Sequence, residues 1–274
     1  MASAFASHGD SKHVLLFPST PKECFDFAAQ ALDLADRLQT PIIVLSDLEL
    51  GMNDNLSEPF EWDDSRRYDR GKVLNAQELD EVEVFGRYLD VDGDGIGYRT
   101  YPGTHPEKGA FFTRGTSRDE FAAYTESPEV YEKNMIRLLK KWHTAAELVP
   151  AAEIATSAQR VGVIYFGTTA LPMPEAMDQL RDEGIELDAC RIRAFPFGAE
   201  VAEFIENHEI VFVVEQNRDA QMRMLLINEL ECNPKQMIAI NYYAGLSISA
   251  NFIVSSITDY YQANKLARLT EVQS

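Results

Sequence analysis

The chain has 274 residues, which is enough for about two domains that each bury a core. Its 45% hydrophobic and 25% charged residues are typical of a globular protein and not of a disordered or fibrous one. The 44 acidic residues outnumber the 25 basic ones, and the net charge of −19 repels nucleic-acid phosphates and anionic lipids. No apolar run reaches the roughly 18 residues of a membrane helix. We therefore expect no nucleic acid and no membrane as partners.

The cysteines and the N-terminus favour a cytoplasmic location. Cys24, Cys190 and Cys232 are odd in number and far apart, as in proteins of a reducing compartment. They offer no ligand set for zinc or for an iron–sulfur cluster. The first residues lack the basic and apolar segments of a signal peptide.

The first readable elements form a strand–helix–strand unit. The apolar run at 14–17 predicts a strand, and the helix start that follows is marked by Thr20, Pro21 and Glu23. Thr20 can accept a hydrogen bond from the amide of Glu23, while Pro21 occupies the first helical position, where its missing N–H costs nothing. Apolar residues then recur at helical spacing, and the run at 42–45 predicts a second strand. Such a unit joins parallel strands by a right-handed crossover.

Two parallel strands do not make a stable sheet, because parallel sheets are buried on both faces and need more neighbours. Residues 48–126 are rich in Gly, Asp, Pro and Tyr, and only 82–88 reads as a further short strand. We therefore expect the strands at 14–17 and 42–45 to pair with residues outside this chain.

The second half of the chain is more regular. A helix capped by Ser127 is predicted to end by Pro150, and the small, polar residues 150–159 read as a linker. Alternating elements follow, with strands at 161–166, 187–192, 210–214 and 237–240 and helices at 174–183, 199–207, 218–230 and 249–266. This alternation predicts an α/β fold in which helices cover both faces of a parallel or mixed sheet.

One acidic segment invites a metal assignment. Asp90, Asp92 and Asp94 begin like a calcium loop of the EF-hand type, but the twelfth position holds Tyr101 where a bidentate Glu is needed. Gly93-Asp94-Gly95 also begins like the magnesium motif of thiamine-diphosphate enzymes, but the first downstream Asn lies too far along the chain. We interpret the segment as an Asp/Gly turn and predict no metal site.

Three polar groups are candidate site residues. His8 and Asp10 precede the first strand, where they line a site or cap a turn. The guanidinium of Arg114 can bind the carboxylate of a ligand with paired hydrogen bonds, and it can equally well pair with acidic side chains nearby. The run Glu215-Gln216-Asn217 follows strand 210–214 at its carboxyl end, the side where α/β sheets place ligands and interfaces. The alternative is that Asn217 only caps the next helix.

Several short motifs, taken together, resemble one family. They are His8-Gly9-Asp10, Lys22-Glu23-Cys24-Phe25, Leu45-Ser46-Asp47-Leu48, Asp69-Arg70-Gly71-Lys72-Val73, Gly86-Arg87-Tyr88 with Asp92-Gly93-Asp94-Gly95, and Phe112-Thr113-Arg114-Gly115-Thr116. In this order the chain resembles the alpha subunits of 2-oxoacid:ferredoxin oxidoreductases, most closely the 2-oxoglutarate type. The resemblance implies part of a thiamine pyrimidine-binding-type domain with a long connecting segment over 1–149. It further implies the linker over 150–159 and a transketolase C-terminal-like domain over 160–274.

The resemblance also implies an activity. Such enzymes use thiamine diphosphate to convert a 2-oxoacid and coenzyme A to acyl-CoA and CO2, and they reduce ferredoxin through iron–sulfur clusters. In this family the beta subunit carries the clusters and the pyrophosphate–magnesium site, so we expect this chain alone to hold no cofactor. The family's glutamate and Tyr-Pro-Ile-Thr-Pro motif are not present here. We therefore expect the C-terminal portion of an alpha subunit, inactive alone; the alternative is a non-catalytic assembly subunit that keeps the dimer-forming half.

For site residues, the resemblance places His8 and Asp10 near the substrate channel. It places Ser46 and Asp47 at the strand end where the family's active site lies. Arg114 becomes a contact for a carboxylate or a partner subunit, and Glu215, Gln216 and Asn217 become interface residues.

Overall fold

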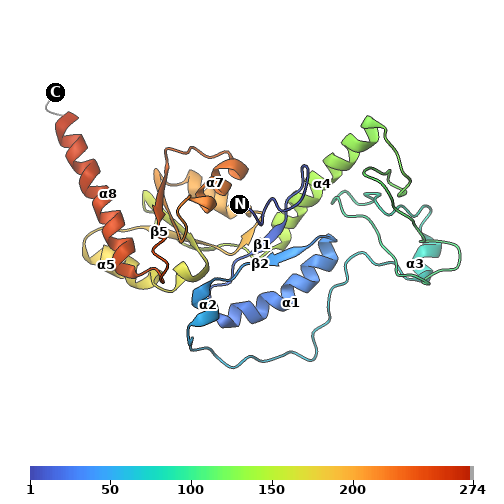
Figure 1. Cartoon of the computed structure of the whole chain (residues 1–274), viewed down its shortest axis with the longest axis horizontal. Coiled ribbons are helices and arrows are strands. Elements are labelled where there is room, and N and C mark those ends of the chain that lie inside the picture. The colour runs from blue at the N-terminus through green and yellow to red at the C-terminus, as the bar shows by residue number, and fades with distance from the viewer. Residues whose placement is uncertain (272–274) are drawn as a thin grey trace.

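The computed structural model describes residues 1–271, with side chains through residue 264, and contains two sheets (Figure 1). The larger sheet has five strands in the order β3–β5–β4–β7–β8. These are β3 (Glu153–Ala155), β5 (Asp188–Ile192), β4 (Val161–Phe166), β7 (Ile210–Glu215) and β8 (Met237–Asn241). All neighbours are parallel except β3, which runs antiparallel to β5. This arrangement confirms the predicted α/β class with a mixed sheet.

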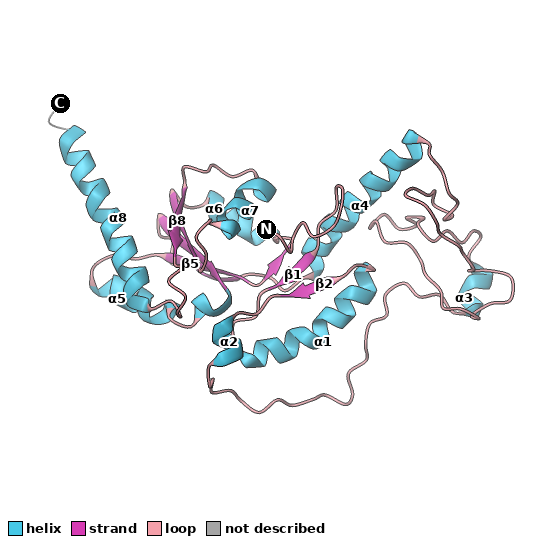
Figure 2. Cartoon of the chain, in the orientation of Figure 1, coloured by secondary structure: helices cyan, strands magenta, loops and turns pink. Residues whose placement is uncertain are grey.

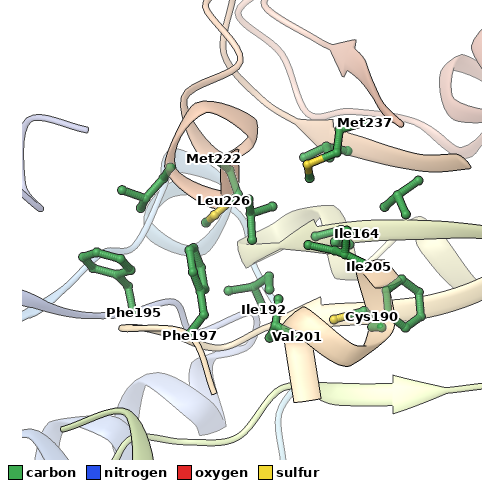
Figure 3. Close-up of a cluster of buried hydrophobic side chains, with 14 of the residues drawn as sticks. Ile164, Cys190, Ile192, Phe195, Phe197, Val201, Ile205, Met222, Leu226 and Met237 are labelled. Atoms are coloured by element: carbon green, nitrogen blue, oxygen red, sulfur yellow. The ribbon is translucent and has the colours of Figure 1, made fainter. Parts of the chain in front are cut away.

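Helices cover both faces of the five-stranded sheet (Figure 2). They are α5 (Met173–Asp182) and α8 (Ala250–Glu271) on one face, and α6 (Ala199–Glu206) and α7 (Gln221–Leu230) on the other. A 3-10 turn, η1 (Gly167–Ala170), follows β4. Figure 3 shows the core under α6 and α7, where Val201, Ile205, Met222 and Leu226 pack on Ile164. The central strands are therefore buried on both sides, as their uninterrupted apolar sequences require.

The expected linker contains a strand. Residues 153–155 form β3 at the sheet edge, where Glu153 lies opposite Arg191 and Ala155 opposite Ala189. All three residues of β3 are exposed, so the segment lacks the apolar alternation by which strands are recognised. The linker reading did not include this strand, because pairing with the open edge of β5 determines its conformation.

The smaller sheet has the order β2–β1–β6. Strands β1 (Val14–Leu16) and β2 (Ile42–Val44) are parallel and joined by α1 (Pro21–Leu38), as predicted. The strand β6 (Ala194–Phe195), which follows β5 directly, pairs antiparallel with β1. The expectation that β1 needs a partner outside the chain is therefore wrong. At the outer edge of β2 no strand lies among the described residues, and for β2 the expectation stays a prediction.

The remaining helices are α2 (Leu48–Met52), α3 (Ala76–Glu81) and α4 (Pro128–Leu148), which Ser127 caps through the amide of Val130. Helices α1 and α4 share a core with β1. The strand expected at 82–88 is absent from the described residues. Val82 ends α3, and a Cβ at Gly86 would lie 2.8 Å from the carbonyl oxygen of Glu120, so this segment is a tightly packed loop. No helix in the described part of the chain is long and apolar enough to cross a bilayer.

A buried arginine connects the two sheets. Arg191 on β5 binds both carboxylate oxygens of Glu23 on α1, at 2.7 and 2.8 Å. It also binds Glu153 on β3 at 2.7 and 2.8 Å and the hydroxyl of Ser19 at 2.6 Å. Burial acts to raise the pKa of Glu23, but hydrogen bonds from Arg191 and Ser19 outweigh it and lower the pKa to about 2. The Glu23 carboxylate also accepts a hydrogen bond from the amide of Ser19 at 2.8 Å.

We predict that Arg191→Met destabilises the full chain by about 3–5 kcal/mol, because the half-buried Glu23 carboxylate then keeps only Arg193, at 3.0 Å, as a cationic partner. Urea unfolding measures the change. The matched control is Arg181→Met, which removes an exposed ion pair with Asp178 and should cost less than about 1 kcal/mol. Equal effects of the two variants would contradict the structural importance of Arg191.

The lowered pKa of Glu23 predicts that the stability of the chain depends on pH. Its pKa is lowered from 4.5 in the unfolded chain to about 2, so its stabilisation is complete above pH 4.5 and is lost as the pH falls toward 2. Between pH 6 and pH 3.5 the wild-type chain should lose about 1.4 kcal/mol more than Glu23→Gln in urea unfolding. Parallel losses in both proteins would show that Glu23 does not have this lowered pKa.

Candidate functional site

A cleft of about 280 Å³ lies where the carboxyl ends of the two sheets meet. Ser46 and Asp47 reach it from the end of β2, Phe166 from the end of β4, and Gln216 and Asn217 from the end of β7. Parallel strands open their carboxyl ends to the same edge, and α/β proteins bind ligands at that edge. The structure thus brings together four of the candidates that the sequence placed on two separate strands.

A chain of hydrogen bonds links the two sides of the cleft. One carboxylate oxygen of Asp47 accepts from the amide of Leu50 at 3.2 Å and caps α2. The other accepts from the hydroxyl of Thr168 in η1 at 2.5 Å. The side-chain amide of Gln216 donates to the hydroxyls of Thr168 at 3.0 Å and Thr169 at 3.3 Å. Asp47 and Gln216 are therefore held in place by buried threonines, and a ligand in the cleft meets a fixed polar wall.

Glu215 and Asn217 have a capping function. The carboxylate of Glu215 is fully buried and accepts from the amides of Met222 at 2.8 Å and Arg223 at 3.1 Å. Asn217 donates to the same carboxylate at 2.6 Å and accepts from the amide of Gln221 at 3.1 Å. A carboxylate at a helix N-terminus satisfies free amides and the helix dipole. Asn217 thus binds the first amide of α7, although the N-cap position itself is Ala220, and Gln216 has its side chain in the threonine network. The interface role expected for Glu215, Gln216 and Asn217 stays a prediction.

His8, Asp10 and Arg114 lie away from this cleft. Asp10 lines a second, apolar groove of about 530 Å³ between the N-terminal segment and α4, while His8 is exposed. Arg114 is also exposed, and its guanidinium lies 5.8 Å from the ring centre of Tyr124 with no carboxylate partner in the described part of the chain. The expected roles of these three residues stay predictions.

The residues present do not fit a metal ion or an iron–sulfur cluster. Carboxylate oxygens of Asp90, Asp92 and Asp94 lie within 4.8 Å of one another. The ammonium of Lys72 binds Asp92 at 2.6 Å and Asp94 at 2.7 Å, and Lys140 binds Asp90 at 3.0 Å. Lysines thus already neutralise these acids. Asp90 also accepts from the amides of Gly93 and Gly95, as the turn interpretation requires, and the three cysteines lie on separate elements.

Little in the sequence points to Thr168 and Thr169 as residues of the cleft. They are almost fully buried, and their hydroxyls connect Asp47 to Gln216. The run Phe166-Gly167-Thr168-Thr169 after a strand predicts a turn more strongly than a phosphate-binding segment, and it does form the turn η1. Only the fold, which brings Thr168 to Asp47 across 121 positions of sequence, shows that it faces Asp47.

No family model matches the chain. The alpha subunit of 2-oxoacid:ferredoxin oxidoreductase 2 of Aeropyrum pernix is 32% identical over 243 residues, which cover 86% of this chain and 36% of that protein. Subunit KorA of the 2-oxoglutarate synthase of Methanothermobacter marburgensis is 28% identical, over 79% of this chain and 56% of its own length. The alpha subunit of 2-oxoacid:ferredoxin oxidoreductase of Saccharolobus solfataricus is 26% identical, over 77% and 33%.

A solved structure supports the same relation at the level of the fold. The 2-oxoglutarate:ferredoxin oxidoreductase from Magnetococcus marinus, solved with 2-oxoglutarate, coenzyme A and succinyl-CoA bound, superimposes with a TM-score of 0.80 at 23% identity. The match covers 94% of this chain and 44% of that chain. The chain spans a third to just over half the length of these curated relatives. The resemblance is confirmed: over most of its length, this chain is related to part of the alpha subunits of 2-oxoacid:ferredoxin oxidoreductases.

Proposed function

We propose that this chain is part of the alpha subunit of a thiamine-diphosphate-dependent 2-oxoacid:ferredoxin oxidoreductase, with 2-oxoglutarate as the favoured substrate. The enzyme would convert the 2-oxoacid and coenzyme A to acyl-CoA and CO2, and pass the electrons to ferredoxin. The observation that carries the proposal is the 32% identity to the Aeropyrum pernix alpha subunit over 86% of the chain. The fold match and the 2-oxoglutarate synthase relatives support it.

In this proposal the cofactors are held mainly by other polypeptide. Thiamine diphosphate, when bound, supplies the carbanion chemistry of decarboxylation, and iron–sulfur clusters carry the electrons. The lysine-paired acids and separated cysteines of this chain suit neither group. A beta subunit would therefore bring the clusters and magnesium site, and further alpha-subunit sequence would complete the pyrimidine-binding part. Residues 1–149 would form the remainder of that part, and residues 160–274 the transketolase C-terminal-like domain.

The cleft between the sheets is the part of the site that this chain would contribute. Ser46, Asp47 and Gln216 lie at the carboxyl edge, where α/β enzymes bind substrates and cofactors. Because Thr168 holds both Asp47 and Gln216, these side chains would orient a bound group without rearranging. Asp47 and Gln216 therefore act in binding and positioning, and the reacting groups come from the cofactor.

The proposal is tested by affinity purification of the tagged chain from its native lysate. We expect a brown complex that contains a second subunit and reduces methyl viologen when 2-oxoglutarate, coenzyme A and thiamine diphosphate are all present. A stable complex without clusters and without this activity would favour the non-catalytic assembly subunit. Purification of the chain alone, with activity remaining in the unbound fraction, would contradict both.

The contact between Asp47 and Thr168 predicts a measurable coupling between the sheets. A double-mutant cycle with Asp47→Ala and Thr168→Val should give a coupling energy of about 1–2 kcal/mol in urea unfolding. Either single variant already removes the hydrogen bond between the hydroxyl and the carboxylate, so the double variant loses less than the sum of the two. Asp47→Ala with Thr258→Val, whose hydroxyl binds Glu183 on the far side of the domain, should give additive effects. Additivity in the first pair would contradict the linked wall of the cleft.

The charge of the chain predicts where ferredoxin docks. Ferredoxins are generally acidic, and a net charge of −19 repels them, so the docking surface should lie on the beta subunit. Reversal of the exposed acids Glu147, Asp182 and Glu206 to lysine should leave the Kd for ferredoxin of the purified complex unchanged within about twofold. A change of more than about tenfold would place docking on this chain.

A further inference from the structure

Basic side chains gather around Tyr88 without acidic partners. The guanidinium carbons of Arg87, Arg118 and Arg137 lie 5.2, 5.6 and 5.7 Å from the centre of its ring. Lys141 follows Arg137 by one turn of α4. We call these four side chains the cation cluster. None of them forms an ion pair with a carboxylate within the described part of the chain.

The four side chains are half-buried, and in this they differ from Arg114, which also lacks an acidic partner but is exposed. Elsewhere basic side chains do pair with acids, among them Lys12, Lys22, Arg66, Arg70, Lys72, Arg99, Lys140, Arg160, Arg191 and Arg218. In the cation cluster, Arg137 binds only the carbonyl of Gly95, and Arg118 binds the carbonyl of Gly115 and the hydroxyl of Tyr88. Arg87 and the Lys141 ammonium have no hydrogen bond to any described residue. Several N–H donors of the cluster therefore have no acceptor among the described residues.

The like charges act on one another. Burial, together with the charges of Arg137 and Arg87, lowers the pKa of Lys141 to about 8. Burial first, and then the charge of Arg87, lowers the pKa of Arg137, whose Nε is buried without an acceptor. Asp90 acts in the opposite direction, but its carboxylate is bound by Lys140 and by the amides of two glycines. Half-buried cations without a counter-ion are destabilising, and an anion among them removes that cost.

The cluster is held in a fixed shape by α4. Asn134, Arg137 and Lys141 lie along one side of the helix, and Asn134 binds the carbonyl of Arg118 at 2.5 Å. Gly95 has a φ of +81°, and a Cβ there would clash with the backbone amide of Lys141, so the loop packs directly on the helix backbone. The donors are therefore preorganised, which favours binding of a small rigid group.

We propose that the cation cluster binds a small oxyanion, a phosphate group or a carboxylate, at a site separate from the cleft between the sheets. Guanidinium groups match both kinds of oxyanion with paired hydrogen bonds, and an ammonium adds a point charge. The half-buried position of all four side chains suits a group of this size better than a flat protein surface. None of the four lines the cleft, so the proposal stands whether or not the proposed function does.

Titration calorimetry on the full chain tests this site, with inorganic phosphate and 2-oxoglutarate as separate probes at constant ionic strength. We expect saturable binding of at least one probe with a Kd on the order of 1 mM or tighter, and the probe that binds identifies the oxyanion. Arg87→Gln should weaken binding at least about tenfold, since it removes one charge-assisted pair of hydrogen bonds to the anion. Arg181→Gln, which removes an exposed arginine on α5, is the matched control.

A second readout does not depend on a variant. Acylation of Lys141 by an amine-reactive reagent, followed by mass spectrometry across pH, reports the protonation of its ammonium. Bound oxyanion should move the half-reaction pH of Lys141 upward by about one unit, because the anion stabilises the charged form. Absence of saturable binding by both probes, or binding that Arg87→Gln and Arg181→Gln affect equally, would overturn the proposal. An unchanged Lys141 profile at saturating probe would also overturn it.

Discussion

The guanidinium of Arg191 is the contact on which the relation of the two sheets depends. It is only 7% exposed, and it binds Glu23 at the start of α1 and Glu153 on β3 at the same time. Buried charges must be paired, so the N-terminal turn of α1 has one favourable position against β5. Because α1 connects β1 to β2, this position also places the smaller sheet.

Apolar packing also joins the two sheets. Leu15 and Phe195 of the smaller sheet lie in the same core as Ile164 and Val213 of the larger one, so the two sheets share one interior although the strands belong to separate ladders. As a result, the carboxyl ends of both sheets face each other across the cleft, and Thr168 reaches Asp47. The proposed binding role of this edge rests on that geometry. The cation cluster lies outside this cleft, where Arg137 and Lys141 of α4 meet the loops that hold Arg87 and Arg118.

Regular periodicity made the second half of the fold predictable, because its strands are continuous apolar runs that alternate with helical segments. The start of α1 at Thr20 was equally readable. Strands β3 and β6 were not, since they have two or three residues and exist only through pairing with β5 and β1. The rule that ligands bind at the carboxyl ends of strands drew attention to Asp47 and Gln216, which line the cleft. Tyr88 contacts Arg118 and Arg137, which lie 30 and 49 positions away in the sequence. No local sequence pattern could therefore predict the cation cluster.

Hydrogen exchange followed by mass spectrometry tests most directly whether Arg191 makes the two sheets one unit. In the wild-type chain, amides of β1 and α1 should be protected to within about tenfold of those in β4 and β7. In Arg191→Met, β1 and α1 should exchange much faster while β4 and β7 keep their protection. Rapid exchange of β1 and α1 already in the wild-type chain would contradict the account, since the smaller sheet would then not be held by β5.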